Sequence, residues 1–281
     1  NAKVESNWID IWDGTPSVAI NNGATIETNK IKVSRGGEIT VTDANLIAAE
    51  SIEVGHNGNS AGKLTESGNS TITGEIKMTA TESTVSSDGG LNVTTSIEGY
   101  TVVFDAENKQ YKLVAIGDVV AKIGGLYYET LAAAITAAQA NDVITFVNDI
   151  TENVTISKNV TIDGANKKYT GKMAGNTGLN VTVQNVNFVN GGFDKKTKGT
   201  TGHYTFKNCT FDGASTYAYP IRIYGAKNIT VENSTVKDYQ YSFLYVPSST
   251  TSVSVKDVTV DNCPSYAVYF ASGVTYAMFE N

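Results

Sequence analysis

The sequence predicts an all-β protein, a right-handed parallel β-helix whose coils hold three strands and about 24 residues. In the C-terminal half, a pattern of Asn or Asp, a small residue, Thr or Asn and an apolar residue recurs every 23 to 26 residues. The strands around it alternate apolar residues with Thr or Ser, which indicates one buried and one wet face. Because solenoid coils bury their inward faces only by stacking, a repeat of this length favours a solenoid.

The repeated Asn or Asp marks a tight corner, because the preceding strand ends only one residue earlier in most copies. Asn and Asp tolerate the left-handed backbone region better than most residues. Stacked corner side chains can form hydrogen bonds from coil to coil, so we expect a structural ladder. Its members are Asn159, Asn185, Asn208, Asn233 and Asp257.

A third strand column is expected at residues 219–223, 241–245 and 266–270. The alignment places Ile221, Phe243 and Val268 at one inward position, and Ile223, Tyr245 and Phe270 at the next. By this parity Tyr219, Tyr241 and Tyr266 also face inward, whereas Tyr224 and Tyr269 face outward.

The N-terminal half predicts a second, smaller β-solenoid. Its repeated strands are expected at 30–33, 51–54, 75–78 and 96–98, with a β-hairpin at 100–104 and 110–114. Thr130 can cap a short α-helix near 130–140 that covers the open end of the second stack. The expected domains are therefore 1–114, an N-terminal β-solenoid ending in a hairpin, and 115–281, a helix-capped parallel β-helix.

Three segments, 121–131, 141–145 and 153–163, resemble the modular right-handed parallel β-helix surface proteins of gut bacteria, whose solenoid is pectate-lyase-like. The segment before them, 98–114, looks like one that closes a module. The resemblance covers roughly 97–281. It implies a secreted or cell-surface protein, and such modules occur in adhesins, in carbohydrate-active enzymes and in proteins of no known role.

Composition narrows the function classes. A net charge of −7 with few Lys and Arg argues against nucleic-acid binding, and the sequence has no apolar run long enough to span a membrane. Neither the two cysteines nor the two histidines have metal-site spacing, so no metal and no cofactor is expected. Because the chain starts at Asn1 rather than Met, we expect a segment of a secreted precursor whose signal and anchor lie elsewhere.

Three carboxylates, Asp212, Asp238 and Asp261, each follow the strand after a corner. Paired carboxylates are what glycoside hydrolysis requires, so these are weak catalytic candidates. A structural role explains these aspartates equally simply, because Asp side chains in turns form hydrogen bonds to the nearby backbone, and we favour that interpretation.

The expected ligand-binding residues are Arg222, Tyr224 and Tyr269, since outward tyrosines stack against sugars and arginine binds carboxylates in a fork. The loop 189–203 is the longest interruption of the repeat, and its Lys195, Lys196 and Lys198 are interpreted as a solvated tip. The sequence favours a non-enzymatic module for adhesion, glycan binding or spacing on a bacterial surface, with a glycan or host surface protein as partner. A polysaccharide lyase or glycoside hydrolase, and a phage tail-fibre segment, are the alternatives.

Overall fold

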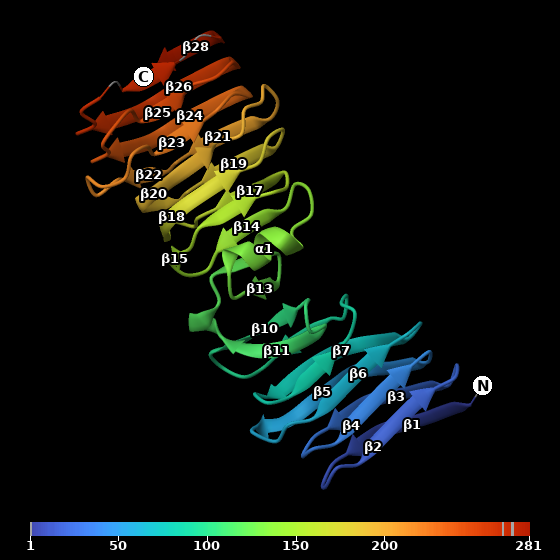
Figure 1. The fold of residues 1–281 in the computed structure, drawn as a ribbon. Helices are drawn as coiled ribbons and strands as arrows, with labels where there is room; N and C mark the ends of the chain where they lie inside the picture. Colours follow the sequence, from blue (N-terminus) through green and yellow to red (C-terminus); the bar gives the residue numbers. More distant parts are fainter. Residues whose placement is uncertain (1, 266, 271–272) are drawn as a thin grey trace. The chain divides into compact units, whose positions relative to one another are not determined.

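The structure is a computed structural model that describes residues 2–265, 267–270 and 273–281. The chain is an all-β parallel solenoid with one short α-helix among the described residues, which confirms the predicted fold class (Figure 1). It divides into two compact units, Asn1–Asp118 and Val119–Asn281. Each unit has its own hydrophobic core, and each is described by itself.

The first unit has two columns of parallel strands. One column contains β1 (Lys3–Ile11), β3 (Thr25–Val33), β5 (Asn45–Gly58), β7 (Thr71–Ala80) and β9 (Val93–Thr95). The other contains β2 (Ser17–Asn21), β4 (Glu38–Thr42), β6 (Lys63–Ser67) and β8 (Thr84–Ser86). The unit ends in the predicted antiparallel hairpin of β10 (Tyr100–Asp105) and β11 (Gln110–Ala115), followed by the 3-10 turn η1 (Ile116–Asp118).

One strand of the first unit was placed wrongly from the sequence. Ile31, Ile52 and Ile76 share a register position as predicted, but the fourth member is Val93 in β9. The predicted strand at 96–98 lies outside β9, in the connection to the hairpin. The spacing of 21 residues after Ile76 favoured Ile97, but the coil is shorter here and β7 pairs with the earlier strand.

The second unit opens with elements that cover the first coil. The strands β12 (Ala121–Ile123) and β13 (Leu126–Tyr128) pair antiparallel, and β12 also pairs antiparallel with β14 (Val143–Phe146). The helix α1 (Leu131–Ala137) buries Leu131, Ala134 and Ile135 and packs against β12, β13 and β16. The helix is shorter than predicted but lies within the expected range.

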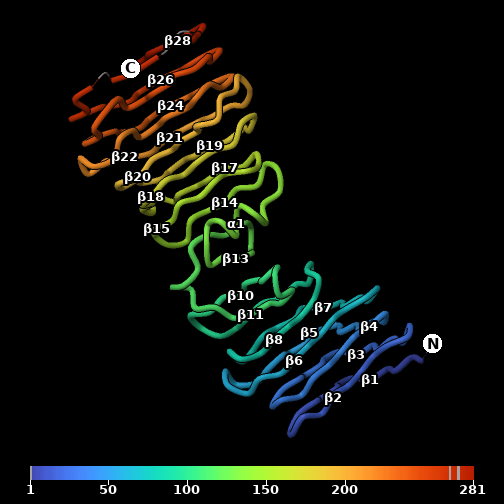
Figure 2. The backbone as a smooth tube through the Cα atoms, viewed as in Figure 1, coloured from blue at the N-terminus to red at the C-terminus, as the bar shows by residue number. Residues whose placement is uncertain are grey.

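The second unit continues as coils of three strands, which Figure 2 shows stacked along this part of the chain. The first column contains β14, β17 (Val160–Asp163), β19 (Asn180–Gln184), β21 (His203–Lys207), the starts of β24 (Ala226–Lys237) and β26 (Thr250–Asp261), and β28 (Val274–Glu280). The second contains β15 (Ile150–Thr151), the starts of β18 (Lys168–Gly175) and β20 (Asn187–Lys195), β22 (Thr210–Asp212), and the ends of β24 and β26. The third contains β16 (Val154–Ile156), the ends of β18 and β20, β23 (Ile221–Ile223), β25 (Leu244–Val246) and β27 (Val268–Phe270).

Aromatic side chains stack inside the second unit where corresponding strands repeat. Tyr169, Phe188 and Phe211 occupy one register position of the second column and are buried. The rings of Phe188 and Phe211 lie parallel with centroids 4.8 Å apart. This interior fixes the register, because a slip of one residue would turn the apolar side chains of a strand to solvent.

Candidate ligand-binding face

The outward face of the third column carries one row of polar and aromatic residues. Asp194, Arg222, Tyr245 and Tyr269 follow one another at a single register position on β20, β23, β25 and β27. Their neighbours along each strand point inward and are buried in β23 and β25. The row is therefore a regular ladder of side chains about 4.8 Å apart from coil to coil.

The sequence alignment of this column was wrong by one residue at β25. Ile221 pairs with Leu244 rather than with Phe243, so Tyr245 faces outward beside Arg222 and Tyr269. Phe243 is also buried, and the extra apolar residue masked the register. Tyr266, expected to face inward, lies outside the described residues.

Five tyrosines form a continuous cluster, which we call the tyrosine face: Tyr219, Tyr224, Tyr241, Tyr245 and Tyr269. The rings of Tyr245 and Tyr269 stack with centroids 4.8 Å apart, and those of Tyr219 and Tyr241 stack at 5.2 Å. Tyr219 and Tyr224 both contact Tyr245, at 4.7 and 6.5 Å. Tyr241 and Tyr269 are exposed, so the tyrosine face offers ring surface to solvent.

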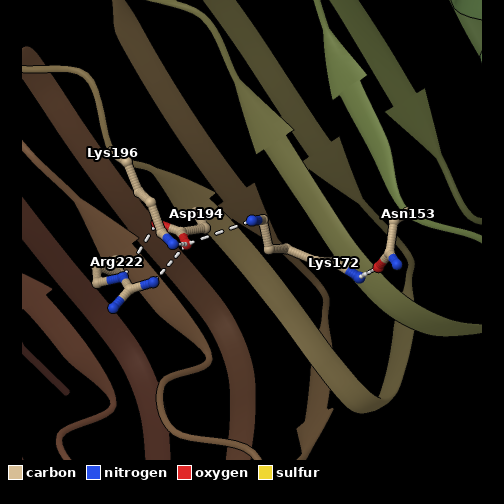
Figure 3. Close-up of polar contacts among 5 residues, drawn as sticks. All are labelled: Asn153, Lys172, Asp194, Lys196 and Arg222. Atoms are coloured by element: carbon tan, nitrogen blue, oxygen red, sulfur yellow. Dashed lines mark hydrogen bonds and ion pairs between the residues drawn. The ribbon is translucent and has the colours of Figure 1, made fainter.

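A buried carboxylate lies at one end of this row. Asp194 is only 5% exposed, and both of its oxygens accept from Arg222, from Nε at 3.0 Å and from Nη2 at 2.5 Å. The hydrogen bonds to Asp194 raise the pKa of Arg222. Lys172 and Lys196 approach the same carboxylate with Nζ atoms 4.0 and 3.8 Å from Oδ2 (Figure 3). We call these four residues the Asp194 cluster.

A cavity of about 160 Å³ lies between the Asp194 cluster and the tyrosine face. Tyr219 belongs to both, since its ring lines the cavity and the Arg222 guanidinium lies 5.4 Å from its centroid. The other lining residues include Phe193, Thr216, Tyr217 and Ala218. The cavity thus combines cationic, carboxylate, hydroxyl-bearing and aromatic residues.

Lys195 holds the chain beneath this site and is not part of a solvated loop tip. It is fully buried, and its Nζ donates to the carbonyls of Thr197, Tyr224 and Gly225 at 2.6, 3.2 and 2.8 Å. Burial lowers the pKa of this amine. β20 runs on to Lys195, so the predicted loop begins later than expected, and the lysine fixes the backbone that carries Tyr224.

The three carboxylates considered for catalysis lie at a different corner, where Asp212 and Asp238 are bonded to neighbouring side chains. Lys237 lies between Asp212 and Asp261 in the register, with Nζ 2.9 Å from Asp212 Oδ2. The hydrogen bond to Lys237 lowers the pKa of Asp212. Asp238 has a left-handed backbone, φ 57°, and accepts from Asn262 Nδ2 at 2.6 Å. These contacts are those of turn residues and of a surface ion pair.

The expected corner ladder is present in part, with one member misplaced. Asn185, Asn208, Asn233 and Asp257 all have φ near +50° at the corner between the first and second columns. Asn159 lies at another corner, ahead of β17, where its Oδ1 accepts from the Asn180 backbone N–H.

The hydrogen-bonded part of the ladder begins at a residue that the sequence did not suggest. Asp163 accepts from Asn185 Nδ2 at 3.0 Å, and Asn185 in turn accepts from Asn208 Nδ2 at 3.3 Å. Asp163 is at the end of β17 and is not itself in the left-handed region. This is why the repeated corner pattern could not identify it.

The remaining chemistry-bearing residues are isolated in the structure. Cys209 and Cys263 are free, and burial raises the pKa of the Cys209 thiol to about 12. No group of three or more metal-ligating side chains occurs within residues 2–265, 267–270 and 273–281. No helix in the described part of the chain is long and apolar enough to cross a bilayer.

These features define the class of protein as a parallel β-solenoid with a cationic and aromatic face on its second unit. The chain matches no family model, no curated protein and no solved structure.

Proposed function

We propose that the second unit is a non-enzymatic glycan-binding module of a secreted or surface-displayed bacterial protein, with the tyrosine face as its ligand platform. The observation that carries this proposal is the contiguous set of five tyrosine rings on the outward side of one strand column. Tyrosine offers an apolar ring for stacking and a hydroxyl for hydrogen bonds, both of which suit a sugar. Two or three coils match the length of a short oligosaccharide.

The composition of the cavity supports binding rather than hydrolysis. Asp194 is the one carboxylate among its lining residues, and hydrolysis of glycosidic bonds uses two. Both oxygens of Asp194 are already bonded to Arg222. Arg222 is a poor general base here, because its carboxylate partner stabilises the protonated guanidinium.

The expected location and partner follow from the resemblance to surface solenoids of gut bacteria, and they form part of this proposal. A surface module that binds sugars would meet host or dietary glycans or a glycosylated host protein. A spacer without a ligand, a lyase or hydrolase, and a phage tail-fibre segment are the competing functions. The enzyme and the tail-fibre segment each have a distinct outcome in the experiment below, and a spacer would bind no glycan.

The test is a glycan array probed with the full chain, followed by titration of the best ligand against the double variant Tyr245→Ala with Tyr269→Ala. Arg222 is left unchanged in this variant, because its removal would leave the buried Asp194 carboxylate without its partner. We expect binding to weaken by about tenfold or more, which corresponds to about 1.4 kcal/mol. Tyr276→Ala, an exposed tyrosine of β28 in the first column, is the matched control and should bind like the wild type.

Other outcomes would contradict the proposal. Unchanged affinity in the double variant, with an unchanged melting temperature, would remove the ligand from the tyrosine face. Release of reducing ends or unsaturated products would show an enzyme. Absence of any glycan ligand together with a stable trimer in sedimentation would favour the tail-fibre alternative.

A further inference from the structure

We infer that the cavity beside the tyrosine face selects a negatively charged sugar, whose carboxylate lies against Lys172 and Lys196 while its ring packs on Tyr219. This inference rests on the proposed glycan-binding function and names the class of its ligand. The recognised chemistry is a sugar carboxylate, whether a terminal sialic acid or a hexuronic acid.

The charges of the Asp194 cluster do not balance. One carboxylate faces three cationic side chains, Arg222, Lys172 and Lys196, so the cluster has two positive charges in excess. The whole chain carries −7, so this excess is a local feature and not a consequence of composition. A concave site of one sign concentrates ligands of the opposite sign.

Arg222 satisfies Asp194 without help from the lysines. Its fork occupies both carboxylate oxygens, which is the strong bidentate geometry of an arginine–carboxylate pair. The Nζ atoms of Lys172 and Lys196 lie 4.0 and 3.8 Å from Asp194, beyond hydrogen-bond distance. Their side chains are 41% and 62% exposed, so these two lysines can be reached by an anion from solvent.

The two lysines approach from different strands and therefore form a cradle. Lys172 comes from β18 and pairs in register with Gly192, whereas Lys196 directly follows β20. Gly192 lets the backbone of Tyr219 and Pro220 approach β20 closely, since a Cβ there would lie 2.6 Å from the Pro220 carbonyl oxygen. The Asn153 side chain accepts from the Lys172 backbone N–H at 2.7 Å and fixes the start of this segment.

The cavity is small, with a volume of about 160 Å³. Tyr219 lines it and also stacks on Tyr241, so a ring on Tyr219 is continuous with the tyrosine face. Thr216 and Tyr217 also line the cavity. An acidic residue can thus occupy the cavity while its neighbouring sugars lie along the tyrosines.

The test measures affinities of the full chain for two matched pairs of probes. The first pair is sialyllactose and lactose, and the second is a hexuronate oligosaccharide and its carboxyl-reduced form. We expect at least one acidic probe to bind about tenfold more tightly than its neutral partner, with an affinity that falls as salt is raised. Which acidic probe shows the preference distinguishes the two sources of the carboxylate.

The double variant Lys172→Gln with Lys196→Gln should reduce acidic-probe affinity to the neutral level and leave neutral-probe affinity unchanged. Lys167→Gln with Lys227→Gln removes the same charge at two exposed positions outside the cavity and should keep the acidic preference. The melting temperature of each variant verifies that the fold is intact.

The outcomes separate this inference from the proposed function. Equal binding of acidic and neutral probes, with loss of both in the tyrosine double variant, would overturn the acidic preference and leave the glycan-binding function standing. An acidic preference that survives in the Lys172 and Lys196 variant would place the carboxylate elsewhere and also overturn the inference. Failure of every oligosaccharide to bind would overturn both.

Discussion

At the scale of single residues, the corners of the second unit depend on backbone conformation as much as on side-chain bonds. Asn208 and Asn233 have φ values of 52° and 49°, a region that costs most residues roughly 1 kcal/mol. Both side chains are exposed; that of Asn208 donates to Asn185 across one coil, whereas that of Asn233 forms no such bond to a described residue. The two positions therefore separate the conformational contribution from the hydrogen bond.

We predict that Asn208→Ala lowers the free energy of unfolding by about 1–2 kcal/mol, because alanine is strained in the left-handed region and the exposed hydrogen bond to Asn185 is lost. Asn208→Gly should lose only the hydrogen bond, and Asn233→Gly should be close to neutral, because glycine accepts a positive φ without strain. Chemical denaturation of the three variants measures the differences. Equal stabilities for Asn208→Ala and Asn208→Gly would show that the left-handed backbone contributes nothing at this corner.

The residues of the candidate site could be predicted only in part. Arg222 and Tyr269 stand out in the sequence because their strands alternate clearly with apolar neighbours. Tyr245 does not, since Phe243 and Leu244 are both buried and the alternation fails at that point. Asp194 and Lys195 lie where β20 continues into a segment whose sequence resembles a loop. No local pattern shows that Asp194 pairs with Arg222 or that Lys195 donates to buried backbone carbonyls.

At the scale of elements, α1 depends on acceptors supplied by other parts of the chain. Thr130 caps the helix by accepting from the Ala133 N–H at 3.1 Å, as its sequence position predicts. Glu152 accepts from the N–H groups of Leu131 and Ala132 at 2.9 and 3.3 Å. At the other end Lys158 donates to the carbonyls of Thr136 and Ala138 at 2.5 Å each. A seven-residue helix needs such partners, because short helices are marginal in water.

We predict that Glu152→Ala destabilises the second unit by about 0.5–2 kcal/mol, since two helix N–H groups lose their carboxylate and its favourable interaction with the helix dipole. Faster hydrogen exchange at the amides of Leu131 and Ala132 is the measurement. Thr151→Ala, an exposed neighbour in β15, is the control and should exchange like the wild type. Unaltered exchange in Glu152→Ala would mean that burial of Leu131 and Ile135 alone holds the helix.

The existence of these elements was easier to predict than their limits. Repeat spacing identified the strands β19, β21, β24 and β26, because each copy adds the same apolar alternation. The end of α1 could not be predicted, because Ala138 leaves the helical region while Asp142 accepts from the Gln139 N–H at 2.7 Å. That bond depends on the turn into β14, which the helix sequence does not contain.

At the scale of the whole molecule, the chain contains two hydrophobic cores, one in each unit. The core of the first unit extends from Ile11 to Tyr111, and that of the second from Ala121 to Val255. In a solenoid each coil is stabilised mainly by its neighbours, so destabilisation spreads along a stack and stops where stacking is interrupted. A change in one core should therefore act within its own unit.

We predict that Ile52→Ala and Ile162→Ala, each removing a fully buried isoleucine, cost about 2–5 kcal/mol in the unit that contains them. Hydrogen exchange measured by mass spectrometry on the full chain should show lost protection across 1–118 for the first variant and across 119–281 for the second. The acidic oligosaccharide bound to the second unit should restore protection only there, because a ligand stabilises the state that binds it. If Ile52→Ala weakened sugar binding or lowered protection throughout 119–281, the two units would have to be treated as one cooperative solenoid.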